Sequence, residues 1–463
     1  MTMRKNKSKY IKRVASADFG RIPTRIESRR KVKLSAEKLF LVITLLFGTI
    51  MVFLAPLFST GDESVHIQNA YYMFSSKQPS TMRSRPDLFK YELEAISPTD
   101  TSFLDTKDLL LNKVDTKGDG FKINLINKDG STYTSYIASG IGILVARIVY
   151  PSLGVMIYFS RFANLLLFAF SFYFLIKRST RGKWILFMLF TIPFMARVYS
   201  PSYDVVQYIA ITAFVLNFFE LYGMKSIREF TKKKAFYFTF TVILLLLVKS
   251  NSKFVLFMLL GLPMLYFPIF NKIKKLSFRS KSVLLIMGAL LTSGFFFIAN
   301  LKFNLFQNIS HFFNDYLNVE SFGRAQRILF QVTPTILPSF VNILWVFCLL
   351  VVGIFEVNRK WSMWTVTVSV ATYFTNWFGI YLGFWIIGMV PAVELSGRYF
   401  YPFMVLFIPL YQRMGYHLNI EISERKIKQI AVISTVLVYL AFIITVLYRV
   451  VVLNVTPLWS NKV

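Results

Sequence analysis

The chain has 463 residues, of which 55% are hydrophobic and only 16% are charged, and it carries a formal net charge of +30 at pH 7. This composition excludes an ordinary soluble domain, because the apolar residues form runs of roughly 20, the length that a helix needs to cross hydrocarbon. A nucleic-acid partner is not indicated, since Lys and Arg gather in short loops between the apolar runs, as in the cytoplasmic loops of membrane proteins. The sequence therefore predicts an all-α polytopic protein of the cell membrane, in contact with the lipid bilayer.

Three parts of the chain differ in composition. Residues 1–35 carry 12 Lys and Arg against two acidic residues, which predicts a basic cytoplasmic arm without a fold of its own. Residues 36–452 are expected to form a single transmembrane domain, and residues 453–463 a short external tail. The single cysteine, Cys348, excludes an intramolecular disulfide.

About eleven helices are expected to cross the membrane, with the N-terminus inside and the C-terminus outside. A basic loop then follows each even-numbered crossing, as the positive-inside rule requires. Residues 59–136 and 302–338 become external loops, and residues 137–150 an amphipathic helix on the outer face, where Arg147 stays in water. The expected crossings are 39–58, 152–176, 184–199, 203–223, 235–248, 254–270, 282–301, 339–356, 361–378, 399–412 and 430–452.

Ionisable residues collect at the predicted outer ends of these helices. A charge at the centre of a bilayer costs about 2.5–3.5 kcal/mol on insertion scales, so such groups usually line a cavity or pair with each other. We therefore expect an outward-facing polar cavity. The candidate residues are Asp62, Glu63, His66, Arg197, Tyr203, Asp204, Lys249, Lys253, Glu394 and Arg398.

The motif GDESVH, residues 61–66, is the sharpest local pattern. If a helix begins here, the carboxylates of Asp62 and Glu63 lie about one turn from the imidazole of His66. That arrangement is typical of a general base with an orienting or metal-binding partner. Alternatively, Asp62 caps the N-terminus of an external helix and His66 is merely interfacial. No Walker, HExxH, GxSxG or CxxC pattern occurs in the chain.

A longer pattern spans four segments. They are APLFSTGDESVHIQNAYYMFSS (55–76), SPSYD (200–204), LVKSNSKFVLFMLLGLP (247–263) and ELSGRYFYPF (394–403). Their order and spacing over most of residues 39–412 resemble the bacterial membrane family called domain of unknown function twenty-one forty-two. Two positions depart from that family's pattern, because Gly61 replaces a Pro and Ser396 replaces a Gln. Neither change removes a chemical group that the expected reaction needs.

That family is similar to the GT-C superfamily of membrane glycosyltransferases, which use polyprenyl-phosphate sugars and carry an acidic catalytic residue in the first external loop. The resemblance implies transfer of a sugar from such a donor to an envelope glycan or teichoic-acid-like acceptor on the extracytoplasmic side. Asp62, or alternatively Glu63, is then expected to accept the acceptor's proton beside His66. Lys249 and Arg398 are expected to neutralise the donor phosphate, or instead to snorkel to lipid headgroups.

The remaining candidates and two other functions stay open. The residues expected around the substrates are Arg197, Tyr203, Asp204, Lys253 and Glu394. Asp204 could instead cap the helix that starts at residue 203. No organic cofactor is indicated, and whether a divalent metal ion takes part is left open. The competing functions are a transporter or flippase for lipid-linked glycans, which predicts charges in mid-membrane and broken helices, and a non-catalytic partner in envelope polysaccharide assembly.

Overall fold

The computed structural model of the chain divides into two units, Met1–Ser35 and Ala36–Val463. All the helices described below belong to the second unit. The residues that the structure describes are 35–55, 57, 63–76, 103–126, 133–195, 200–224, 229–248, 250–262, 272, 273, 275–317, 337–357, 359–386, 400–418, 420–448 and 452.

Among the described residues, five helices are long and apolar enough to cross a membrane. They are α2 (Ala36–Leu54), α6 (Leu153–Arg178), α8 (Asp204–Tyr222), α11 (Phe278–Phe303) and α17 (Glu424–Leu447). Every other regular element among the described residues is also helical, apart from an isolated bridge between Lys113 and Ser152. The prediction of an all-α membrane protein is therefore confirmed, whereas the number of eleven crossings and their direction stay predictions.

The other expected crossings overlap helices that are shorter or less apolar. These are α7 (Lys183–Met195), α9 (Lys232–Leu246), the 3₁₀ helix η5 (Ser250–Gly261), α14 (Ser339–Phe355), α15 (Met363–Ile386), the 3₁₀ helix η7 (Tyr401–Phe407) and α16 (Ile408–Leu418). The expected crossing at 399–412 is thus divided into two helices. Pro402 and Pro409 lie in the first turn of η7 and α16, where a missing N–H is tolerated. In one continuous α-helix from Tyr401, Pro409 would be interior and would remove a backbone hydrogen bond.

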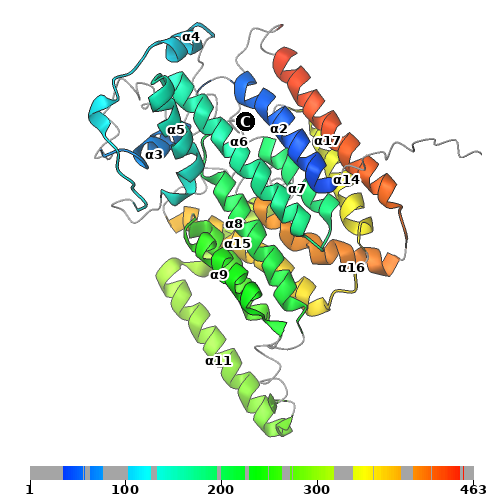
Figure 1. Ribbon diagram of the computed structural model, residues 1–463. Helices are drawn as coiled ribbons and strands as arrows, with labels where there is room; N and C mark the ends of the chain where they lie inside the picture. The colour runs from blue at the N-terminus through cyan, green and yellow to red at the C-terminus, as the bar shows by residue number, and fades with distance from the viewer. Residues whose placement is uncertain are drawn as a thin grey trace, which may run out of the picture. The chain divides into compact units, whose positions relative to one another are not determined.

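Helix α2 packs between α6, α7 and α17 (Figure 1). Its contacts are aromatic: the ring of Phe40 lies 5.9 Å from that of Phe172 on α6 and 6.1 Å from that of Phe187 on α7. Seven residues further along, Phe47 stacks on Tyr439 of α17 at 4.5 Å. Because Phe40 and Phe47 are two turns apart on one face, these pairs fix both the position and the rotation of α2.

Residues 63–149, here named the α3–α5 subdomain, form most of a second apolar cluster, which Leu57 and the start of α6 complete. The helices of the subdomain are α3 (Glu63–Tyr72), α4 (Phe103–Leu111), η2 (Lys117–Asp119), η3 (Thr134–Tyr136) and α5 (Ile137–Val149). The buried Asn124 side chain donates 2.7 Å hydrogen bonds to the carbonyls of Tyr72 and Ser75, and the Tyr71 hydroxyl donates to the buried Asp119 carboxylate. These bonds hold residues 119–124 against the end of α3, so this part of the expected external loop is folded.

Helix α5 packs closely on the first half of α6. A Cβ added to Gly142 would lie 2.4 Å from the Phe159 carbonyl oxygen, so only glycine permits this approach. Arg147, expected to stay in water, is half-buried and donates to the carbonyls of Phe74 and Gly120 at 3.4 and 3.3 Å. Arg147 therefore ties α5 to the end of α3 and to residue 120 within the subdomain, by satisfying two backbone carbonyls.

A partly buried carboxylate marks the opposite end of the bundle. Glu356, which follows α14, accepts hydrogen bonds from the backbone N–H groups of Lys183, Trp184 and Ile185 at 2.6, 2.7 and 2.8 Å. Burial raises the pKa of Glu356 from 4.5 to about 7, although these three N–H groups act in the opposite direction. Lys183 also pairs with Glu37 in the first turn of α2 at 3.4 Å. We call this region the Glu356 end.

Candidate functional site

Helix α3 begins at Glu63, within the GDESVH motif. The expectation that a helix starts here is confirmed, and it places Glu63 and His66 one turn apart on the helix. Both side chains are buried, with exposed fractions of 1% and 4%. Asp62 immediately precedes the helix in sequence and lies outside the described residues.

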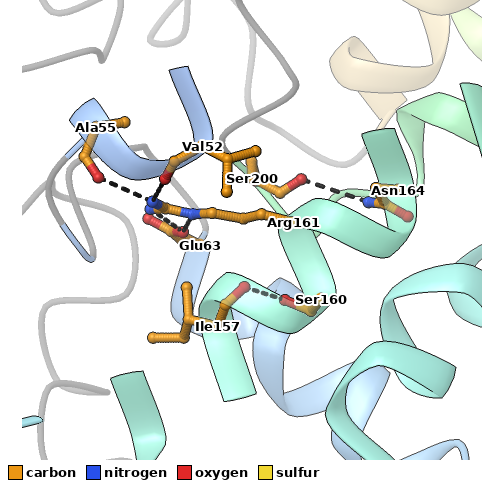
Figure 2. Close-up of polar contacts among 8 residues, drawn as sticks. All are labelled: Val52, Ala55, Glu63, Ile157, Ser160, Arg161, Asn164 and Ser200. Atoms are coloured by element: carbon orange, nitrogen blue, oxygen red, sulfur yellow. Dashed lines mark hydrogen bonds and ion pairs between the residues drawn. The ribbon is translucent and has the colours of Figure 1, made fainter. Parts of the chain in front are cut away.

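Glu63 forms a buried ion pair with Arg161 of α6 (Figure 2). Oε1 of Glu63 accepts from Nη2 of Arg161 at 2.6 Å and from Nε at 3.0 Å. Nη1 of Arg161 donates to the carbonyls of Ala55 and Val52 at 2.9 and 3.3 Å. Both charged side chains have no exposed surface. The guanidinium therefore joins α3 to the C-terminal end of α2, where a cation also complements the helix dipole. We call this region the Glu63 end.

Asn164 lies three residues beyond Arg161 on the same face of α6 (Figure 2). Its amide nitrogen donates to the carbonyls of Ser202 and Ser200, at 3.1 and 3.4 Å. One face of α6 thus holds two segments of the sequence pattern, GDESVH through Arg161 and SPSYD through Asn164. Neither contact could be deduced from spacing, because the partners are 98 and 36 to 38 residues apart.

The SPSYD segment leads directly into α8. The hydroxyl of Ser202 accepts from the backbone N–H of Asp204 at 3.0 Å. Asp204 is the first residue of the helix and is buried, with 1% of its surface exposed. Ser202 thus supplies one acceptor for the free N–H groups at the start of α8. Whether Asp204 itself caps this helix or faces a substrate stays a prediction.

Three aromatic rings meet beside Glu63. His66 Nδ1 lies 3.0 Å from the hydroxyl of Tyr136, and its ring centroid lies 5.2 Å from that of Tyr203, edge to face. The rings of Tyr136 and Tyr203 are 5.9 Å apart. His66 comes from GDESVH, Tyr203 from SPSYD and Tyr136 from η3, so three distant segments close around one imidazole.

A fourth segment reaches the same region. The hydroxyl of Thr134, two residues before Tyr136, donates to the carbonyl of Leu247 at 2.6 Å. Leu247 and Val248 are the first two residues of the family-like segment LVKSNSKFVLFMLLGLP (247–263) and directly precede Lys249. Segments 63–66, 134–136, 200–204 and 247–248 therefore converge at the Glu63 end.

Comparison with known proteins identifies the family. A model for the family described as "Predicted membrane protein (DUF2142)" matches residues 45–407. The chain belongs to this family. The matched range contains every residue of the Glu63 end named above, and it ends at the last residue of η7. No curated protein and no solved structure matches the chain.

The structure describes only part of the predicted site. Among the described candidates, Glu63, His66, Tyr203 and Asp204 lie together at the Glu63 end, whereas Lys253 is exposed on η5. Within the described ranges, no three His, Cys, Asp or Glu side chains are grouped as metal ligands. The candidates outside the described residues, whose roles stay predictions, are Asp62, Arg197, Lys249, Glu394 and Arg398.

Arg161 and Asn164, which position this region, are not among the residues predicted from the sequence. The signal for Arg161 was present, since it lies inside the apolar stretch expected to cross at 152–176. An arginine there costs about 2.5–3.5 kcal/mol to insert and usually has a partner. Asn164 gave no comparable signal, because a neutral amide in a helix is common and its partners are backbone carbonyls.

Proposed function

We propose that the protein is a membrane glycosyltransferase that transfers a sugar from a polyprenyl-phosphate-linked donor to a cell-envelope glycan or teichoic-acid-like acceptor at the extracytoplasmic face. The observation that carries this proposal is the convergence of GDESVH, SPSYD and the segment before Lys249 at one end of the bundle. A donor whose lipid chain stays in the bilayer carries its sugar phosphate at the membrane surface, so a site at the ends of membrane helices could bind it.

The reaction needs a carboxylate and a cation. The acceptor hydroxyl attacks the anomeric carbon and gives its proton to the carboxylate, while the bond from that carbon to the phosphate oxygen breaks. The electron pair leaves with the lipid phosphate, whose charge a lysine or arginine stabilises. We assign the base to Asp62 and the phosphate contact to Lys249 and Arg398, which belong to three of the family-like segments.

The ion pair of Glu63 supports the choice of Asp62 as base. Glu63 is fully buried and holds Arg161, which in turn binds the end of α2. A carboxylate that takes up a substrate proton would lose its charge and weaken this buried pair at every turnover. Glu63 is therefore better suited to holding the helix start in place, and its neighbour Asp62 to the chemistry.

Two isosteric substitutions separate these roles. Asp62→Asn should lower sugar transfer by at least about 100-fold, because an amide cannot accept the proton, while the melting temperature changes little. Glu63→Gln should lower both the melting temperature and the amount of folded protein, because it leaves the Arg161 charge without its counterion. Transfer is measured by mass spectrometry on purified protein with candidate lipid-linked sugars, beside thermal unfolding of each variant.

The matched control is Asp115→Asn, an exposed carboxylate of the same subdomain, which should keep full transfer. Full activity in Asp62→Asn would remove the base assignment. Movement of the lipid-linked sugar across vesicles without any transfer product would instead favour a transporter.

A further inference from the structure

The α3–α5 subdomain exposes a short apolar segment that the proposed function does not use. In residues 121–126, four side chains are apolar and at least half exposed: Phe121 62%, Ile123 56%, Leu125 50% and Ile126 66%. A soluble surface rarely places four such residues within six positions, because roughly 25 cal/mol is lost for each Å² of apolar surface left in water. The exposed side chains of this segment would therefore be more stable in contact with an apolar environment than with water.

The segment is held near its start, in its middle and near its end. Asn124 is buried and donates its backbone N–H to the carbonyl of Met73 at 2.9 Å, while the Phe121 ring stacks on Phe74 at 6.1 Å. At the far end the carbonyl of Leu125 accepts from the N–H of Tyr133 at 3.0 Å. The apolar side chains are thus presented by a rigid edge and not by a chain that could fold back over them.

Helix α5 exposes a second apolar face on the same subdomain. Its exposed residues are Ile137, Ile141, Val145, Ile148 and Val149, with exposed fractions from 41% to 80%. The first four follow each other at intervals of four, four and three, so they form one stripe along the helix. Gly142, beside this stripe, packs on Phe159 of α6, which joins the exposed face to a helix long enough to cross a membrane.

The contacts with α6 set the depth of these surfaces. The basic last turn of α6 ends at Arg178, and counting back roughly 20 residues, the thickness of the hydrocarbon, leads to about Tyr158. Gly142 of α5 therefore lies near the boundary of the hydrocarbon at the Glu63 end. Because α5 runs opposite to α6, its start at Ile137 lies deeper than its end at Val149.

Segment 121–126 follows the same change in depth as α5, from shallow at residue 121 to deep at residue 126. Gly120 is bound by Arg147 near the shallow end of α5, and Leu125 is bound by Tyr133 near its deep end. We infer that residues 121–126 and the exposed stripe of α5 insert into the boundary between headgroups and acyl chains of one lipid leaflet. The occupant of this apolar surface is the bilayer itself, since the helix that carries it crosses the same bilayer.

The exposed lysines beside the segment agree with a lipid headgroup layer above it. Lys113, Lys117 and Lys122 are all exposed, whereas of the two acidic residues between them Asp115 is exposed and Asp119 is buried, so the exposed charge is mainly positive. Lysine side chains that flank an inserted apolar edge can extend to phosphate groups while their methylene groups stay beside the acyl chains. This inference does not depend on the proposed sugar transfer, because it concerns only where the subdomain lies.

Fluorescence at single cysteines tests the depth. In a Cys348→Ser background, Lys117→Cys, Ile123→Cys and Ile126→Cys would each carry an environment-sensitive label, with the purified protein in phosphatidylcholine vesicles. Quenching by lipids with a nitroxide on the acyl chain should be at least about twofold stronger at positions 123 and 126 than at 117, and strongest at 126. Aqueous iodide should give the reverse order.

The result that overturns the inference is equal access of iodide to positions 117, 123 and 126. Protection seen only in native membranes, and lost in vesicles of the purified protein, would also overturn it and indicate a protein partner on this surface. The elution volume of each labelled variant must match that of the parent, so that a folding defect is not taken for exposure.

Discussion

Glu63 and Glu356 are carboxylates at opposite ends of the bundle, the first fully and the second partly buried, and they are accommodated in different ways. Glu63 is held by a formal cation, the guanidinium of Arg161. Glu356 is held by the N–H groups of three successive residues, Lys183 to Ile185, at the start of α7. Backbone dipoles tolerate a neutral carboxyl group, whereas a buried guanidinium requires an anion. The carboxylate of Glu63 is therefore expected to stay ionised, whereas that of Glu356 can take up a proton.

The largest expected effect follows from removing the cation at the Glu63 end. Arg161→Met leaves Glu63 buried without its partner and frees the carbonyls of Val52 and Ala55, so unfolding should become easier by about 3–5 kcal/mol. Thermal unfolding in detergent, followed by intrinsic fluorescence, measures the loss.

The double variant Arg161→Met with Glu63→Gln is the matched control, because it removes both charges together. It should recover part of the stability, since a neutral amide is less costly to bury than an unpaired carboxylate. A single variant as stable as the parent would show that the pair is not what holds α3.

A smaller, pH-dependent effect is expected at the Glu356 end. Because the pKa of Glu356 is raised to about 7 in the folded protein, its contribution to stability is complete below about pH 4.5 and is lost as the pH rises through 7. Glu356→Gln should remove this dependence, which amounts to at most about 3 kcal/mol. Melting temperatures of parent and variant, compared from pH 5 to pH 8, provide the measurement.

Glu421→Gln, at an exposed carboxylate near the same end, should leave the pH dependence as in the parent. Parallel curves for the parent and Glu356→Gln would mean that Glu356 keeps its ordinary pKa, and the contrast between the two ends would fail.

Single-cysteine labelling, the smallest perturbation, tests which side of the membrane each end of the bundle faces. The expected topology places the loop after α6 in the cytoplasm and the α3–α5 subdomain outside. The structure makes Thr180 the better probe of that loop, because it is exposed while Ser179 is buried. In a Cys348→Ser background, an impermeant maleimide on intact cells should label Lys117→Cys but reach Thr180→Cys only after permeabilisation. The opposite pattern would reverse the two ends.

Sequence patterns predict where the helices lie better than they predict which segments those helices contact. Apolar runs locate α2, α6, α8, α11 and α17 because membrane insertion acts on each segment by itself. They do not predict that residues 119–124 fold against α3, since that depends on the buried side chain of Asn124 and its bonds to Tyr72 and Ser75. Contacts between distant segments carry no local signature.

The candidate site shows the same division. GDESVH correctly predicts a helix start at Glu63, because short polar residues before an apolar stretch favour one. It does not predict that Glu63 pairs with Arg161, or that the ring of Tyr203 packs edge to face on His66. Those outcomes depend on how α6 and α8 are rotated, which their nearly uniform apolar surfaces leave undetermined.

The pairing of Glu63 with Arg161 also has a consequence for biosynthesis. The ribosome adds Arg161 98 residues after Glu63, which at about 5–20 residues per second takes roughly 5–20 s. During that interval α2 and α3 exist without the guanidinium that later joins them. Insertion of α6 then brings a positive charge into the bilayer at a cost that Glu63 offsets only if it is already beside the entering helix. The order of synthesis therefore favours α2 and α3 being in place before α6 inserts, so that the Glu63 end assembles in the direction of translation.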